Sequence, residues 1–198
     1  ISLAQSNKFA EARIELSAAA EEYQRAVDAD PSLPAMQHAL AGCLNNVARI
    51  DLDAGSPEKA RPLILRALDH ERLALKANSQ QLSYQQFLQN QLWNLSRCYI
   101  AAGEIREAAA LADELSGSVT KGFESPRAAA HLLAKCAAAA AVTGPGGLDP
   151  VPFQTAAIAE LRKAISRGFK NSRELLDDSV YAPLRARAEF AEILAAVK

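Results

Sequence analysis

The sequence resembles itself when it is shifted by 48 residues. Three copies share two aligned positions, Asn7 with Gly55 and Gly103, and Ala12 with Ala60 and Ala108. The second and third copies also match upstream, at Leu40 and Leu88, Leu44 and Leu92, Asn46 and Asn94, Val47 and Leu95, Arg49 and Arg97, Leu52 and Ile100, and Ala54 and Ala102. A fixed period of this length predicts stacked repeats, each of which packs on its neighbours.

Apolar residues recur at steps of three and four, and β-branched residues do not alternate with a period of two. We therefore predict an all-α fold in a single domain, residues 1–198. The expected helices cover about 8–29, 33–54, 57–77, 80–102, 104–116, 126–142, 151–167, 172–177 and 182–197. The last of them mixes apolar and charged residues, as a capping helix with one solvent-facing side does.

Glycine, serine and proline mark the predicted turns. Gly55 tolerates positive φ and closes the second helix, and Ser56 caps the third helix with Pro57 at its first position. Pro62 lies only in the second turn of that helix, where it does not end the helix. Residues 1–6 align with the end of a helix before Asn7, so we expect the chain to be a piece of a longer protein.

The third copy departs from the period after Leu115. A polar, glycine-containing stretch from Ser116 to Ser125 is expected to form a loop, and Thr143 to Gly147 a connector between helices.

The spacing of one unit resembles the tetratricopeptide repeat. That family has a large residue, a leucine, a small residue, an aromatic residue, a glycine and an alanine at fixed steps. The corresponding residues are Leu92, Leu95, Ser96, Tyr99, Gly103 and Ala108 in one copy, and Leu44, Val47, Ala48, Asp51, Gly55 and Ala60 in the copy before it. Asp51 departs from the pattern at the aromatic position. The resemblance implies an α-solenoid, a right-handed superhelix of about four antiparallel helix pairs with a C-terminal capping helix.

The unit is longer than the usual 34 residues, so it looks like the long-repeat branch, as in kinesin light chains. It is also similar to the tandem repeats that follow the catalytic domain of many planctomycete-type bacterial serine/threonine kinases. The paired Asn45 and Asn46 and the segment Glu71 to Leu73 carry that similarity. It implies a regulatory or docking region of a kinase, although this chain has no glycine-rich loop, catalytic-loop Asp or Asp-Phe-Gly segment.

In the resembling family the first helix of each pair faces a concave groove. The corresponding positions here are Asn45, Arg49, Asp53, Asn90, Trp93, Arg97 and His131. Asparagine and arginine one turn apart can bind the carbonyls and carboxylates of a peptide. The alternative is that these are ordinary solvent-facing residues, and that Trp93 packs between helices.

The composition argues against other classes of partner. With a net charge of −1 and no basic stripe, we expect no nucleic-acid binding. No apolar run is long enough to cross a bilayer, and we expect a cytoplasmic protein with no membrane insertion. Cys43, Cys98 and Cys136 are expected to be buried, reduced thiols.

No pattern of catalytic or metal-binding residues stands out. His38, His70 and His131 each lack a second ligand one turn away, so no metal or other cofactor is expected. We expect a scaffold that is not an enzyme and that binds a protein or peptide of unknown identity. The alternative is a structural module that associates with further copies of itself through the ends of the repeat array.

Overall fold

The structure is a computed structural model, and it describes residues 3–119, 122–142 and 147–197. Within these ranges the chain is helical, with no β-strand, which confirms the predicted all-α class. The chain divides into two compact units, Ile1–Cys98 and Tyr99–Lys198. Each unit has its own buried core and is described by itself.

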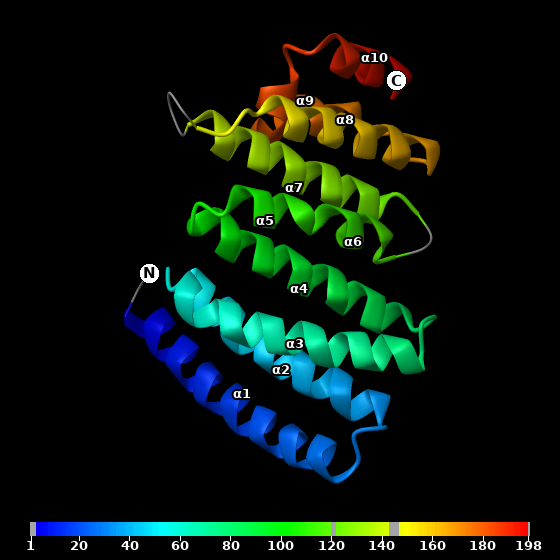
Figure 1. The fold of residues 1–198 in the computed structure, drawn as a ribbon. Helices are drawn as coiled ribbons and strands as arrows, with labels where there is room; N and C mark the ends of the chain where they lie inside the picture. Colours follow the sequence, from blue (N-terminus) through cyan, green and yellow to red (C-terminus); the bar gives the residue numbers. More distant parts are fainter. Residues whose placement is uncertain (1–2, 120–121, 143–146, 198) are drawn as a thin grey trace. The chain divides into compact units, whose positions relative to one another are not determined.

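The first unit contains helices α1 (Leu3–Ala29), α2 (Pro34–Asp53), α3 (Pro57–Ala77) and most of α4 (Leu82–Ala101). Helix α2 packs against both α1 and α3 (Figure 1). The predicted bounds of the second and third helices agree with α2 and α3 to within one residue. Pro62 lies inside α3 without ending it, because its missing N–H falls near the helix start.

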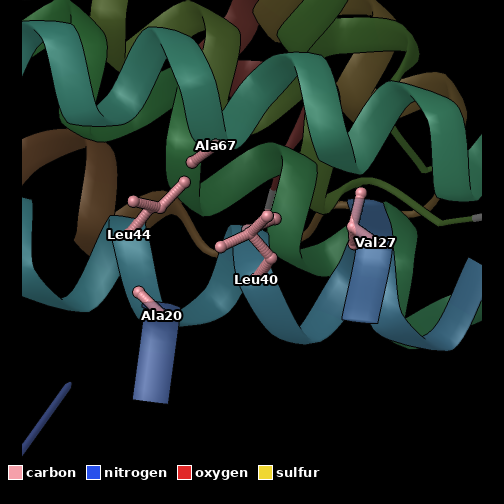
Figure 2. Close-up of a cluster of buried hydrophobic side chains, with 6 residues drawn as sticks. Ala20, Val27, Leu40, Leu44 and Ala67 are labelled. Carbon is pink, nitrogen blue, oxygen red and sulfur yellow. The ribbon is translucent and has the colours of Figure 1, made fainter. Parts of the chain in front are cut away.

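Helices α1, α2 and α3 meet in a cluster of buried apolar side chains (Figure 2). Leu40 and Leu44 project from α2 between Ala20 and Val27 of α1 and Ala67 of α3. Burying a leucine contributes about 1.5–3 kcal/mol. The small alanine side chains let the helix backbones approach closely around these leucines.

The 48-residue period reappears in the hydrogen bonds of the turns. Gly55 and Gly103 both have φ close to +76°, a conformation that favours glycine. The N–H groups of Gly55 and Ser56 donate to the carbonyls of Leu52 (3.0 Å) and Asp51 (2.8 Å), and those of Gly103 and Glu104 to Ile100 (3.1 Å) and Tyr99 (2.9 Å). Both turns are therefore Schellman motifs with the same bonding pattern.

A second repeated contact lies at the other end of α2 and α4. The side-chain amide of Gln37 donates to the carbonyl of Pro31 (2.9 Å), and that of Gln85 donates to the carbonyl of Ser79 (2.7 Å). Each bond ties the first turns of a helix to the loop that precedes it. The sequence period thus corresponds to a repeated local structure at both ends of these helices.

The second unit contains α5 (Ile105–Ala110), α6 (Ala112–Gly117), α7 (Glu124–Ala141), α8 (Val151–Ser166), α9 (Ser172–Asp177), the 3-10 helix η1 (Ser179–Leu184) and α10 (Ala188–Ala196). Helix α7 packs against α5, α6, α8 and η1. Its alanines Ala130, Ala134 and Ala137 are fully buried, which allows several helices to surround it.

Three predicted helix bounds are wrong. The first helix begins at Leu3 and runs through Asn7 without a turn, because no positive-φ glycine stands there to end a preceding helix. The predicted helix 104–116 is divided at Leu111, whose N–H bonds to Ala108, three residues back, rather than to the fourth. The predicted helix 182–197 is η1 followed by α10, since Pro183 lacks a donor and Arg187 is extended.

The predicted cap at Ser56 is half right. Ser56 occupies the N-cap position of α3 with Pro57 after it, but its hydroxyl makes no capping bond because its backbone (ψ 63°) is not extended. The predicted loop from Ser116 to Ser125 is too long at both ends, because α6 continues to Gly117 and α7 begins at Glu124. The Val119 N–H after α6 donates to the Ser125 hydroxyl of α7 (3.1 Å). Most of the predicted connector 143–147 lies outside the described residues.

Candidate functional site

Helices α2 and α4 border a hollow of about 280 Å³ in the first unit. Its lining consists of Asn45, Asn46, Arg49, Phe87, Asn90, Trp93 and Asn94. Four predicted groove residues, Asn45, Arg49, Asn90 and Trp93, are therefore brought together. The α2 residues lie one turn apart, and the α4 residues follow steps of three and four, so each set occupies one helix face.

The floor of the hollow contains a pair of nearly buried asparagines. The Asn94 amide donates to the Asn45 side-chain oxygen over 3.0 Å, linking α4 to α2. A buried amide costs free energy unless it is hydrogen-bonded. The bond therefore holds both amides at fixed positions, with Asn46 and Asn90 beside them on the more exposed part of the lining.

One end of the hollow is charged. The Asp53 carboxylate accepts from the Arg97 guanidinium (3.0 Å) and, more distantly, from Arg49 on its own helix (3.5 Å). Two guanidinium groups share one carboxylate, so this end carries one excess positive charge. All three side chains are between a third and just over a half exposed, and they are accessible to a ligand.

Phe87 and Trp93 form the apolar part of the lining. Both are half-buried, and Phe87 lies with its ring edge-on to His38, with 4.7 Å between ring centroids. A Cβ at Gly42 would be only 3.4 Å from Phe87 Cε1, so Gly42 gives this ring its space against α2. The hollow thus combines an aromatic wall, amide groups and a cationic end within a single surface.

The remaining predicted residues are placed differently. Asp53 and Arg97 do not line the hollow but pair at its charged end, and His131 belongs to the second unit. The sequence prediction omitted Asn46, Phe87 and Asn94. Asn46 and Asn94 match in the 48-residue shift, which could have found them, and Phe87 lies one turn before Asn90, so extending the predicted helix face by a turn would have found it.

A buried polar cluster lies next to Phe87. His38 Nδ1 of α2 is 2.9 Å from Glu71 Oε1 and 3.1 Å from Oε2. The Gln91 amide of α4 donates to Glu71 Oε2 over 3.3 Å. Glu71 and Gln91 are fully buried, and Gln91 Oε1 has no hydrogen-bond partner among the described residues.

Burial dominates the protonation of this cluster. It raises the pKa of Glu71 to about 8, and the Gln91 donor opposes that rise. Burial also lowers the pKa of His38. Both shifts favour the uncharged forms, so the pair carries no net charge at neutral pH. His70, the next histidine along, is a half-buried residue whose Nδ1 lies 2.6 Å from Gln37 Oε1.

The second unit contains another histidine–carboxylate contact. His131 Nε2 lies 3.2 Å from Asp178 Oδ2, and its ring meets Tyr181 edge-on. Burial lowers the pKa of His131, while Asp178 opposes that shift. The Tyr181 hydroxyl is buried and has no partner among the described residues. Arg127 and Glu174 form an adjacent ion pair of 2.6 Å.

A serine, a lysine and a glutamate also meet in this unit. Lys163 Nζ donates to Ser116 Oγ (2.6 Å), and the Ser116 hydroxyl donates to Glu160 (2.5 Å). These hydrogen bonds link Ser116 of α6 to Glu160 and Lys163 of α8, and so join the two helices.

Two further hollows have apolar floors. One of about 220 Å³ lies between α1 and α3 over Leu40 and Leu44, and one of about 400 Å³ lies between α6 and α8 beside Leu133. Within the described ranges, no three His, Cys, Asp or Glu side chains converge as metal ligands would. Cys98 and Cys136 are buried and unlinked, and Cys43 is half-buried and unlinked.

Among the described residues, none of the helices combines the length and apolar character that crossing a membrane requires. No protein-family model matches the chain, and neither does a curated protein or a solved structure.

Proposed function

We propose that this chain is a non-catalytic protein-interaction module that binds an extended peptide segment of a partner protein in the hollow between α2 and α4. The observation that carries the proposal is the convergence of Asn45, Arg49, Asn90 and Trp93 on that hollow. They project from the helix faces that the repeat pattern selects.

The chemistry of the hollow suits a polypeptide backbone with side chains attached. Asparagine amides can both donate to and accept from peptide groups. Arg49 and Arg97 can bind a carboxylate by two parallel hydrogen bonds, as guanidinium groups do. Phe87 and Trp93 supply flat apolar surface for a neighbouring side chain, the type of contact that dominates interface energies.

We further propose that the helices belong to a tetratricopeptide-like array, a right-handed superhelix of about four helix pairs. The matching Schellman turns at Gly55 and Gly103, and the matching Gln37 and Gln85 bonds, support repeated units. A docking role beside a serine/threonine kinase rests on the sequence resemblance alone. A search for a kinase domain in the same protein tests that role, because the role requires one.

Selection from a random peptide display library tests the proposed binding. The variant Arg49→Ala, Trp93→Ala, Arg97→Ala should lose about tenfold or more in affinity for every selected peptide, because anchor residues carry most interface energy. Arg25→Ala is the matched control, since Arg25 is an exposed arginine of α1 that pairs with Glu22. If the triple variant is folded and binds the selected peptides as the wild type does, the hollow is not the binding site.

A second candidate function is self-association through α1. Ile14 is 70% exposed and Phe9 is 41% exposed on this helix, and a second copy of the chain could cover them. Sedimentation at increasing concentration tests it, with Ile14→Glu expected to keep the chain monomeric. A wild-type chain that is monomeric at the highest concentration excludes this function.

A further inference from the structure

Glu71 is the meeting point of three helices. It projects from α3, contacts His38 of α2 through both carboxylate oxygens, and accepts from Gln91 of α4. It is fully buried. Helix α4 also places Tyr84 and Phe87 against the His38 ring, with centroid separations of 4.5 and 4.7 Å. One carboxyl group and one imidazole therefore lie at the centre of the contact that α4 makes with α2 and α3.

A carboxylate in this position lacks the water that would stabilise its charge. The groups that face it are His38, the neutral amide of Gln91 and, against His38, the Tyr84 ring. The remaining ionisable neighbours act on His70, one residue along α3: Arg66 and Asp69 of α3, and Asp28 of α1. The His38–Glu71 pair therefore depends on one shared proton to remain free of net charge.

The pair also contacts the wall of the hollow. Phe87 lines the hollow and lies against the His38 ring, and Gln91 lies on α4 between Asn90 and Trp93, two further lining residues. A displacement of α4 relative to α2 therefore changes the hollow, whose two sides are these two helices.

We infer that His38, Glu71 and Gln91 form a proton-dependent latch, which holds α4 against α2 and α3 while the pair keeps its shared proton and loosens α4 when that proton leaves. This inference rests on the proposed function only in that the hollow is the ligand site. The latch then regulates binding: the hollow is formed at neutral pH and loosened in mildly alkaline solution.

Loss of the proton leaves the Glu71 carboxylate beside two neutral groups, His38 and Gln91. Water that enters between α3 and α4 then stabilises the charge. Burial raises the pKa of Glu71 to about 8, which puts the change in an accessible range. Gln91 Oε1 adds to the effect, because it has no hydrogen-bond partner among the described residues and gains one when water enters.

Trp93 reports the state of the latch without any peptide, because it is the only tryptophan of the chain and lines the hollow. Its emission and its quenching by acrylamide should be measured from pH 6 to pH 9, below the range where tyrosine ionises. We expect quenching to rise with a midpoint near pH 8 in the wild type. Glu71→Gln, which cannot ionise, should lose the transition and keep the low quenching of the neutral form.

Gln91→Leu is the second variant. It removes the donor that stabilises the charged carboxylate, so the midpoint should shift to higher pH. If Glu71→Gln does not fold, the midpoint measured for Gln91→Leu tests the latch. Asp178→Asn is the matched control in the second unit, and it should leave the Trp93 transition unchanged.

The latch is overturned if Trp93 quenching in the folded wild type does not change between pH 6 and pH 9. It is also overturned if folded Glu71→Gln keeps the transition, if Gln91→Leu leaves the midpoint unchanged or lowers it, or if Asp178→Asn abolishes the transition. Because no peptide is present, a failed peptide selection leaves these outcomes as they stand. A failed latch likewise leaves the peptide result unaffected.

Discussion

The two units each hold a histidine against a carboxylate, but they expose the carboxylate to different degrees. The Glu71 side chain beside His38 is 0% exposed, whereas the Asp178 side chain beside His131 is 33% exposed. Water therefore stabilises the charge of Asp178 and not that of Glu71. The energetic role of a histidine–carboxylate pair therefore depends on the solvation of the acid as well as on the contact.

Asp51 and Asp53 are two further acids that pair with a cation, and their exposure also differs. The Asp51 side chain, paired with Arg13, is 9% exposed, and that of Asp53, paired with Arg97, is 41% exposed. The effect of disturbing each pair should fall as exposure rises, from Glu71 through Asp51 and Asp178 to Asp53.

The largest effect is expected for Glu71→Gln. Burial raises the pKa of Glu71 from 4.5 to about 8, so the folded chain keeps a proton that the unfolded chain has released. The free energy of unfolding therefore falls as pH rises through this window, and the stability is fully present only below pH 4.5. Between pH 6.5 and pH 9 the wild type should lose about 2 kcal/mol relative to Glu71→Gln, measured by urea unfolding.

This pH range excludes the titration of His38. Burial lowers the pKa of His38, so protonation of its ring reduces the free energy of unfolding only below about pH 6.5. Equal pH dependence in wild type and Glu71→Gln would contradict the buried, protonated acid.

Arg13→Ala should have the next largest effect. Arg13 donates to both Asp51 oxygens, at 2.8 and 3.1 Å, and its removal leaves a nearly buried carboxylate without its cation. We expect a loss of about 1–2 kcal/mol at pH 7, by urea unfolding. In the Asp51→Asn background the same change should cost less than half as much, and Arg25→Ala on the same helix should cost about 0.5 kcal/mol or less. Equal costs in both backgrounds would mean that the pair contributes nothing.

Asp178→Asn should alter stability by about 0.5 kcal/mol or less, because its partner contact is partly solvated. The substitution retains an oxygen that can accept from the Val180 N–H, a bond of 2.9 Å in the wild type. The difference between variant and wild type should also be independent of pH from 6.5 to 9. A pH dependence as large as that of Glu71→Gln would remove the distinction between the two units.

The smallest effect is expected for Arg97→Ala, at about 0.3 kcal/mol in the free chain, because exposed ion pairs contribute little. The same substitution is part of the variant expected to lose peptide affinity. Thermal unfolding and peptide binding of one sample measure both quantities. A stability loss above about 1 kcal/mol would give Arg97 a structural role in place of the binding role.

Local signals in the sequence predicted most helix ends. Glycine at positions 55 and 103 permits the positive φ that ends a helix, and Pro57 suits the first turn of the next helix, so α2 and α3 could be bounded closely. The break at Leu111 has no such signal, since alanine and leucine favour a continuous helix. Packing against α7 competes with that local preference, and a single sequence does not show it.

Asn45, Arg49, Asn90 and Trp93 line the hollow. The sequence pointed to these four residues through the resemblance to the tetratricopeptide repeat. The His38–Glu71 contact could not be predicted in the same way. These two residues lie on different helices, and their pairing depends on how α2 and α3 are rotated about their axes. Asp51 lies between these two cases. It occupies an aromatic position of the repeat, so the sequence marked it as unusual, but only the structure shows that Arg13 is its partner.

The matching turns at Gly55 and Gly103 have a practical use in protein engineering. A segment cut after Gly55 and after Gly103 starts and finishes in the same backbone conformation, with the same two hydrogen bonds at each junction. Residues 56–103 are thus bounded by the same kind of turn at both ends, so a tandem duplication of this segment would join it to itself through a turn that the chain already uses.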